Sequence, residues 1–171
     1  MNLTAVRDPQ QIVQRHFGES FFAGRNLLNP DDSLKIIDVG SGAGFPGLPI
    51  AMYAPQSEVT LIESQNKKAA FLNEAIRSLG LKNTQVFNRR AENYNGFAQL
   101  VTMRAVEKFE AVLPTAAKLV GLGGRLAFMA GSAQVPMATK LLPKLLWQEP
   151  ATVPGGHSRV LLTGTKSVNV E

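Results

Sequence analysis

Apolar residues along this chain follow two alternating patterns, and the alternation predicts the order of its elements. Short apolar runs typical of buried strands occupy residues 34–39, 58–63, 84–88, 99–103, 125–130, 146–153 and 159–166. Between them, apolar residues recur at helical spacing over residues 47–53, 65–79, 109–120 and 134–146. Strands that alternate with helices favour an α/β fold, a mostly parallel sheet with helices on both faces. The turn 154–156 makes the last two of the seven predicted strands a C-terminal antiparallel hairpin.

The first 30 residues contain one further helix signal. Asp8 and Pro9 are of the types that cap a helix and occupy its first position. The predicted apolar face of this helix consists of Ile12, Val13, His16, Phe17 and Phe21. We therefore predict a single domain over residues 1–171, in which residues 1–30 form a helix and linker packed on the core.

Composition narrows the class of protein. The chain has 171 residues, of which 44% are hydrophobic, as expected of a folded domain with a core. It contains no run of ~18 apolar residues, and its amino-terminal segment is too polar for a signal peptide. We therefore expect a cytoplasmic protein without a membrane partner. The net charge of +5 suits a polyanionic partner, and we expect a monomer that holds no metal.

Residues 38–47 give the strongest functional signal in the chain, with the sequence Asp-Val-Gly-Ser-Gly-Ala-Gly-Phe-Pro-Gly. They connect the predicted strand 34–39 to the predicted helix 47–53. Glycine allows the backbone to turn sharply and to approach a ligand closely, and the start of a helix presents free N–H groups. This arrangement is typical of a site for a nucleotide-like cofactor.

Two cofactors compete for this loop. Gly42, Gly44 and Gly47 match the dinucleotide spacing, and Glu63 follows at about the 20-residue distance of an NAD site. Asp38 changes the balance, because a carboxylate before the first glycine repels a pyrophosphate but can hold an ammonium group, directly or through water. S-adenosylmethionine carries an amino acid where NAD carries phosphates. The loop therefore favours S-adenosylmethionine.

Residues near predicted strand ends supply further candidates for the site. Glu63 ends the second strand, where a carboxylate can accept hydrogen bonds from ribose hydroxyls. Arg104 follows the fourth strand, at the edge of the sheet where ligands gather. We expect Arg104 at an exposed rim, so that Arg104→Ala leaves folding intact. Phe45 has two interpretations, since it either packs against the cofactor or covers the core.

Residue types that the chain lacks restrict the reaction. Without cysteine, the thiolate mechanism of pyrimidine C5 methylation is excluded. Residues 102–105 read Thr-Met-Arg-Ala, which lacks the Asn/Asp-Pro-Pro-aromatic clamp used on exocyclic amines. A ring nitrogen with an exposed lone pair, such as guanine N7, loses no proton before attack. Its methylation is chiefly a task of positioning.

Several motifs together resemble one family. The segment 38–47, with Pro46 before its last glycine, resembles the bacterial 16S ribosomal RNA guanine-N7 methyltransferases, also called glucose-inhibited division protein B. Further matching motifs, in the expected order, are Asn2-Leu-Thr-Ala-Val-Arg-Asp8, Arg15-His16-Phe17, Lys67-Lys68, Phe71-Leu72, Arg90-Ala91-Glu92, Arg104-Ala105-Val106 and Arg159. The resemblance covers essentially the whole chain. It implies the Rossmann-like fold of S-adenosylmethionine-dependent methyltransferases.

The resemblance also implies ligands and the residues that hold them. The cofactor is S-adenosyl-L-methionine, with S-adenosyl-L-homocysteine as product, and the partner is ribosomal RNA or the small ribosomal subunit. The implied cofactor-binding residues are Asp38, Gly40, Gly42, Gly44, Phe45, Glu63, Ala91, Glu92 and Arg104. Arg104 is also the implied catalytic residue. The implied RNA-binding residues are Lys67, Lys68, Arg90 and Arg159.

Two departures from the family pattern keep alternatives open. Family members carry several more helices before the motif at Asn2, with which this sequence begins. They also commonly have a lysine where this chain has Ala130, so a basic residue near the substrate face is missing. The alternatives are a small-molecule methyltransferase and a non-catalytic protein that binds S-adenosylmethionine or RNA.

Overall fold

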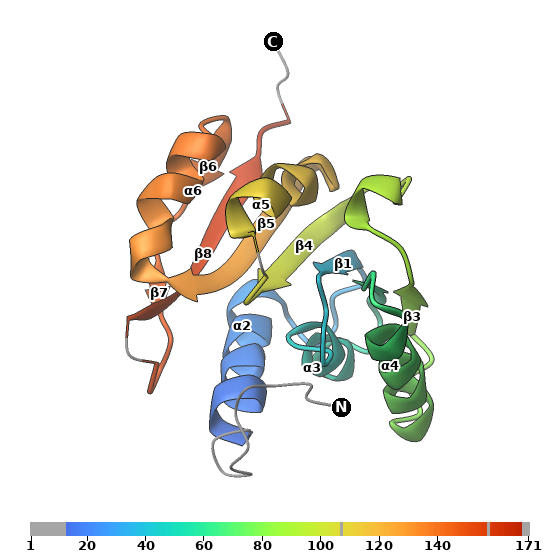
Figure 1. Cartoon of the computed structure of the whole chain (residues 1–171). Helices are drawn as coiled ribbons and strands as arrows, with labels where there is room; N and C mark the ends of the chain where they lie inside the picture. Colours follow the sequence, from blue (N-terminus) through green and yellow to red (C-terminus); the bar gives the residue numbers. More distant parts are fainter. Residues whose placement is uncertain (1–12, 107, 157, 169–171) are drawn as a thin grey trace.

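A mixed sheet runs through the part of the chain that the computed structural model describes, residues 13–106, 108–156 and 158–168 (Figure 1). Its strands are β1 (Lys35–Val39), β2 (Glu58–Ile62), β3 (Thr84–Phe87), β4 (Ala98–Arg104), β5 (Val120–Gly131), β6 (Leu145–Trp147), β7 (Ala151–Thr152) and β8 (Arg159–Lys166). They lie in the order β3-β2-β1-β4-β5-β8-β6, and β7 pairs with β8 off this path. Neighbours among β1 to β5 are parallel, whereas β8 is antiparallel to β5, β6 and β7. The predicted mostly parallel sheet with an antiparallel C-terminal end is therefore confirmed.

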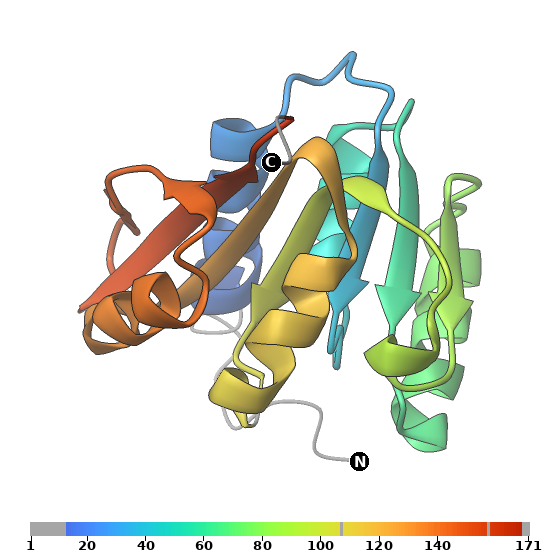
Figure 2. The ribbon, with the colours of Figure 1, turned by 90° about the horizontal axis from the view of Figure 1, so that it is seen from above.

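Helices cover both faces of the sheet (Figure 2). The helices on one face are α2 (Glu19–Leu27), α3 (Gly47–Tyr53) and α4 (Asn66–Ser78). The helices on the other face are α5 (Phe109–Lys118) and α6 (Val135–Leu141). Three short turns of helix complete the set, namely the π-helical η1 (Val13–Gly18) and the 3-10 helices η2 (Ala91–Asn93) and η3 (Ser132–Gln134).

The two helical layers explain why the strands are apolar at successive positions. In β1, Ile36 packs into the cluster under α2 and α3, whereas its neighbour Ile37 packs into the cluster under α5. Side chains alternate between the faces of a strand, so a sheet covered on both faces requires apolar residues at both. Because β1, β2, β4 and β5 are parallel, the residues that follow them lie at one edge of the sheet. This carboxyl edge positions the candidate site.

Prolines change two of the predicted elements. The predicted strand 146–153 is split into β6 and β7, because Pro150 has no N–H to donate to a neighbouring strand. The sheet consequently has eight strands rather than the seven predicted. The predicted helix 134–146 is helical only to Leu141, because Pro143 disfavours helical conformation in the residue before it.

The amino-terminal helix exposes a different face from the one predicted. Residues 8–12 lie outside the described part of the chain. Phe17, predicted to face the core, is 38% exposed, whereas Glu19 and Ser20 are buried. Residues 13–18 are π-helical, and the wider turn of a π-helix shifts the register on which a 3.6-residue periodicity depends. Glu19 is buried because two arginine side chains reach it, as described below.

Candidate functional site

The glycine loop after β1 is held against the end of β2. The N–H groups of Gly40 and Ser41 donate to the carbonyl of the last residue of β2, at 2.9 and 3.0 Å. The Glu63 carboxylate accepts the Gly42 N–H at 3.0 Å and the Gln65 N–H at 2.8 Å, one on each oxygen. A carboxylate has about four acceptor positions. Glu63, which is 6% exposed, therefore retains acceptor capacity beside the loop.

Two glycines of the loop region have different roles. A Cβ on Gly47 would lie 2.3 Å from Leu61 Cδ2 and 2.8 Å from Asp38 Oδ2, so packing inside the protein requires this glycine. Gly42 has a φ of +56°, and the nearest described atom to an added Cβ is the Gly40 carbonyl oxygen, at 3.8 Å. Among the described residues, no atom therefore crowds the position of a side chain at Gly42. A ligand can approach the backbone there, which fits S-adenosylmethionine.

Asp38 lies beneath this loop rather than in an open cleft. Its Oδ1 accepts the Thr102 hydroxyl at 2.8 Å, and its buried Oδ2 has no hydrogen bond of good geometry. Burial raises the pKa of the carboxyl to about 6, although hydrogen bonds from Thr102, Ser41 and the Gly47 N–H and the charge of Arg104 act to lower it. Asp38 is 0% exposed, whereas a direct contact with an ammonium group requires an accessible oxygen.

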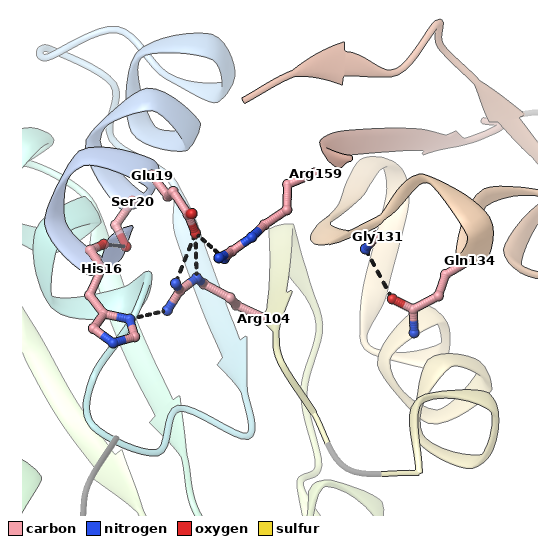
Figure 3. A network of polar contacts seen from close by, with 7 residues as sticks. All are labelled: His16, Glu19, Ser20, Arg104, Gly131, Gln134 and Arg159. Atoms are coloured by element: carbon pink, nitrogen blue, oxygen red, sulfur yellow. Dashed lines mark hydrogen bonds and ion pairs between the residues drawn. The ribbon is translucent and has the colours of Figure 1, made fainter. Parts of the chain in front are cut away.

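Arg104 belongs to a buried ion-pair network (Figure 3). Its Nη2 and Nε donate to Glu19 Oε2 at 2.8 and 3.3 Å, and Arg159 Nη1 donates to the same oxygen at 2.8 Å. The side chains of Arg104, Glu19 and Arg159 are 7%, 4% and 23% exposed. The prediction that Arg104 lies at an exposed rim is therefore wrong. Residues of η1 and α2, His16 and Glu19, cover its side chain.

Glu19 is the residue of this network that the sequence analysis missed. It comes from α2, far in sequence from both of its partners, whereas Arg104 ends β4 and Arg159 begins β8. A signal was present, because an acidic residue next to the expected core face of a helix needs a buried cation. The partners, however, cannot be read from local spacing.

His16 and Phe45 connect this network to the glycine loop. Arg104 Nη1 lies 2.9 Å from His16 Nδ1. A guanidinium only donates, so Nδ1 is the acceptor and bears no proton. The His16 ring stacks on Phe45, with centroids 5.3 Å apart, and Phe17 meets Phe45 edge-on at 4.9 Å. The amino-terminal segment therefore packs directly on the loop, and Phe45 forms that contact.

A pocket of about 360 Å³ opens at the carboxyl ends of β4 and β5. Arg104 and Arg159 line one part of it, and Ala130 and Gln134 line another. The Gln134 Oε1 accepts the Gly131 N–H at 3.1 Å (Figure 3). Pockets that hold ligands in sheets of this kind lie at this edge. The glycine loop and the pocket thus share one edge of the sheet.

The other predicted residues follow β2 and β3 at the same edge. Lys67 is exposed and Lys68 is half-buried in the first turn of α4. Arg90 is exposed, and the adjacent η2 buries Ala91 and exposes Glu92. The structure thus presents Lys67 and Arg90 to solvent, while Arg159 contacts Glu19 and lines the pocket.

Neither a metal-binding cluster nor a membrane-spanning helix occurs in residues 13–106, 108–156 and 158–168. Nowhere in these ranges do three or more His, Asp or Glu side chains gather so as to hold a metal ion. Within the same ranges, every helix is too short or too polar to cross a bilayer.

The sequence matches a family model described as GidB, rRNA small subunit methyltransferase G, over residues 1–143. The chain belongs to the GidB family. A "Ribosomal RNA small subunit methyltransferase G" from Roseiflexus castenholzii is 37% identical over 97% of this chain and 76% of the relative. One of the same name from Stenotrophomonas maltophilia is 41% identical over 76% of this chain, and the match spans 60% of that relative.

The fold of this GidB chain is that of S-adenosylmethionine-dependent methyltransferases. A solved structure of a SAM-dependent methyltransferase from Aquifex aeolicus superposes with a TM-score of 0.69 at 15% identity. The superposition covers 92% of each chain. The Rossmann-like fold predicted from the resemblance is therefore confirmed.

Proposed function

We propose that this GidB chain transfers the methyl group of S-adenosylmethionine to N7 of a guanine in 16S ribosomal RNA. Family membership supports the reaction class, and the chain's GidB relatives bear the name of small-subunit ribosomal RNA methyltransferases. One observation supports the mechanism. An arginine-lined pocket of about 360 Å³ lies at the same sheet edge as the open glycine loop.

The glycine loop supplies the cofactor contacts in this proposal. Gly42 offers backbone without a side chain, Glu63 offers acceptors to the ribose, and Ala91 and Glu92 border the adenine. When bound, S-adenosylmethionine supplies an electrophilic methyl group. Asp38 supports the loop from beneath rather than through an open contact.

The pocket positions the guanine. Attack by N7 requires no general base, since the lone pair is already available, and alignment is the main demand. The Arg104 and Arg159 guanidinium groups border the pocket, and arginine binds guanine O6 or a phosphate well. Arg104 is the proposed catalytic residue on this basis. Lys67, Lys68 and Arg90 extend the cationic edge along the RNA backbone.

The setting of the reaction follows from the substrate. We propose that the enzyme acts in the cytoplasm, where ribosomal RNA is assembled. We further propose that it acts as a monomer, because the glycine loop and the pocket both come from one chain. Gln134 and Ala130, near the proposed base position, leave the pocket without a lysine.

The test is methyl transfer from labelled S-adenosylmethionine to small subunits and to protein-free 16S RNA that lack the modification. We expect label at one guanine, released by the strand cleavage that N7-methylguanine permits. Label on a small metabolite but not on RNA would support the first alternative. Binding of S-adenosylhomocysteine without transfer to either RNA would support the non-catalytic alternative.

A further inference from the structure

Glu19 lies behind the two arginines of the pocket and offsets part of their charge. Its Oε2 accepts from Arg104 and from Arg159, each at 2.8 Å, and its side chain is 4% exposed. Both guanidinium groups line the pocket, whereas Glu19 stands behind them on α2. Figure 3 shows dashed lines from one Glu19 oxygen to both guanidinium groups. The Glu19 carboxylate thus faces both cations.

The proposed reaction makes this charge balance important. The N7 lone pair forms a bond to the methyl carbon, the carbon–sulfur bond breaks, and its electron pair stays on sulfur. Positive charge therefore leaves the sulfonium and appears on the purine ring. A guanidinium beside that ring opposes the change, and it does so more strongly in a partly buried site than in water.

His16, a further contact of Arg104, does not provide this balance. His16 Nδ1 accepts from Arg104 Nη1 at 2.9 Å, so it offers a lone pair but no negative charge. The amino-terminal segment therefore contributes two different contacts to one guanidinium. His16 fixes its direction, and Glu19 fixes its direction and also offsets its charge.

We propose that Glu19 is a positioning residue that compensates the charge of Arg104 and Arg159, so that an arginine-lined pocket tolerates a cationic N7-methylguanine. The inference rests on the proposed function, because methylation of a ring nitrogen such as N7 places a new positive charge on the base. It assigns α2, which precedes the first strand of the sheet, a part in the chemistry.

Glu19→Gln tests the proposal, because it keeps the size of the side chain and removes its charge. We expect the single-turnover rate at saturating RNA and cofactor to fall about tenfold or more, which corresponds to ~1.4 kcal/mol. The affinity for RNA should stay equal or rise, because one negative charge is lost at a surface that binds a polyanion. A merely structural role would lower rate and affinity together.

A binding measurement tests the same point without turnover. Calorimetry should show that Glu19→Gln lowers the affinity for 7-methylguanosine monophosphate relative to guanosine monophosphate by about tenfold. Glu74→Gln removes the same charge from an exposed ion pair with Arg77, so it should leave the rate and this ratio unchanged. S-adenosylhomocysteine binding within twofold of the parent would show that the glycine loop is intact.

Adding Arg159→Gln to Glu19→Gln should restore much of the rate at saturating RNA, because one uncompensated cation is removed. If Glu19→Gln alone does not fold, the same rate and binding measurements on the double variant and on Arg159→Gln are compared in its place. An unchanged rate and nucleotide ratio in an active parent background would overturn this inference, as would parallel losses of rate and RNA affinity. A parent that transfers no methyl group to RNA would instead overturn the proposed function.

Discussion

The glycine loop and the arginine network lie at the same edge of the sheet but hold their charged groups by different means. Glu63 accepts backbone N–H groups from Gly42 and Gln65, which are 21 and 2 positions away in sequence. Glu19 accepts side-chain donors from Arg104 and Arg159, which are 85 and 140 positions away in sequence. Backbone donors persist through nearly every substitution, whereas a guanidinium disappears with a single one.

The comparison teaches which part of the site tolerates change. The loop depends on backbone conformation, so only substitutions that alter the backbone or fill the open space should damage it. The network depends on three side chains that are mostly buried, so the loss of any one leaves the others poorly solvated.

The largest effect should come from filling the loop. Gly42→Val places a β-branched side chain in the open space at a φ of +56°. We expect the affinity for S-adenosylhomocysteine to fall by at least ~1,000-fold, about 4 kcal/mol, in a calorimetric titration. Gly80→Val is the matched control, because Gly80 has a φ of +64° and no atom within 4 Å of an added Cβ among the described residues. Equal losses in both variants would attribute the effect to backbone strain alone.

The next effect should come from the network. Among the described residues, Arg104→Ala leaves Arg159 as the ion-pair partner of the buried Glu19 carboxylate. We expect the free energy of unfolding to fall by about 3 kcal/mol and the rate of methyl transfer to fall roughly 100-fold. Chemical denaturation and single-turnover assays measure the two quantities.

Arg77→Ala is the control for this prediction, since the exposed pair with Glu74 should contribute less than ~0.5 kcal/mol. If Arg104→Ala and Arg77→Ala are equally stable, the network does not stabilise the fold. The sequence-based expectation that folding survives the loss of Arg104 would then hold after all.

A smaller effect should depend on pH. Burial raises the pKa of Asp38 from 3.8 to about 6 in the folded protein, so the folded state binds this proton more tightly than the unfolded chain. The resulting stabilisation is complete below pH 4 and is lost as the pH rises through 6. Asp38→Asn lacks the titrating group. The parent should therefore lose roughly 2–3 kcal/mol of unfolding free energy relative to Asp38→Asn as the pH rises from 4 to 7.

Urea titrations of both proteins across this pH range measure that difference. Glu74→Gln provides the control, because its exposed carboxyl should leave the gap to the parent nearly constant. A constant gap for Asp38→Asn as well would show that Asp38 titrates normally in the folded protein.

The smallest effect should come from the exposed lysines beside the loop. Lys67→Ala combined with Lys68→Ala should lower the slope of log affinity for RNA against log salt by roughly one to two. The stability should change little, because Lys67 is exposed. Lys82→Ala alters a lysine just before β3, at the opposite end of the sheet, and should leave the slope unchanged. Equal slopes for all three proteins would place the RNA elsewhere.

The sequence alone predicted the elements whose signals are local. Strands and helices alternate as predicted because both faces of the sheet are buried, and this gives strands such as β1 and β2 a continuous run of buried residues. The glycine loop was predictable for a similar reason. Its contacts join residues that are close in sequence or that follow neighbouring strands, so spacing and residue type determine it.

The tertiary structure decided where the charged groups of the arginine network lie. The amino-terminal periodicity predicted an apolar face that included Phe17, but the π-helical turn places Glu19 toward the sheet instead. Arg104 was placed correctly at the end of β4 and wrongly at an exposed rim, because nothing local to it specifies that α2 covers it. Ion pairs act through space and leave no periodic trace in sequence. Only the packed chain brings Glu19 within 2.8 Å of both arginines.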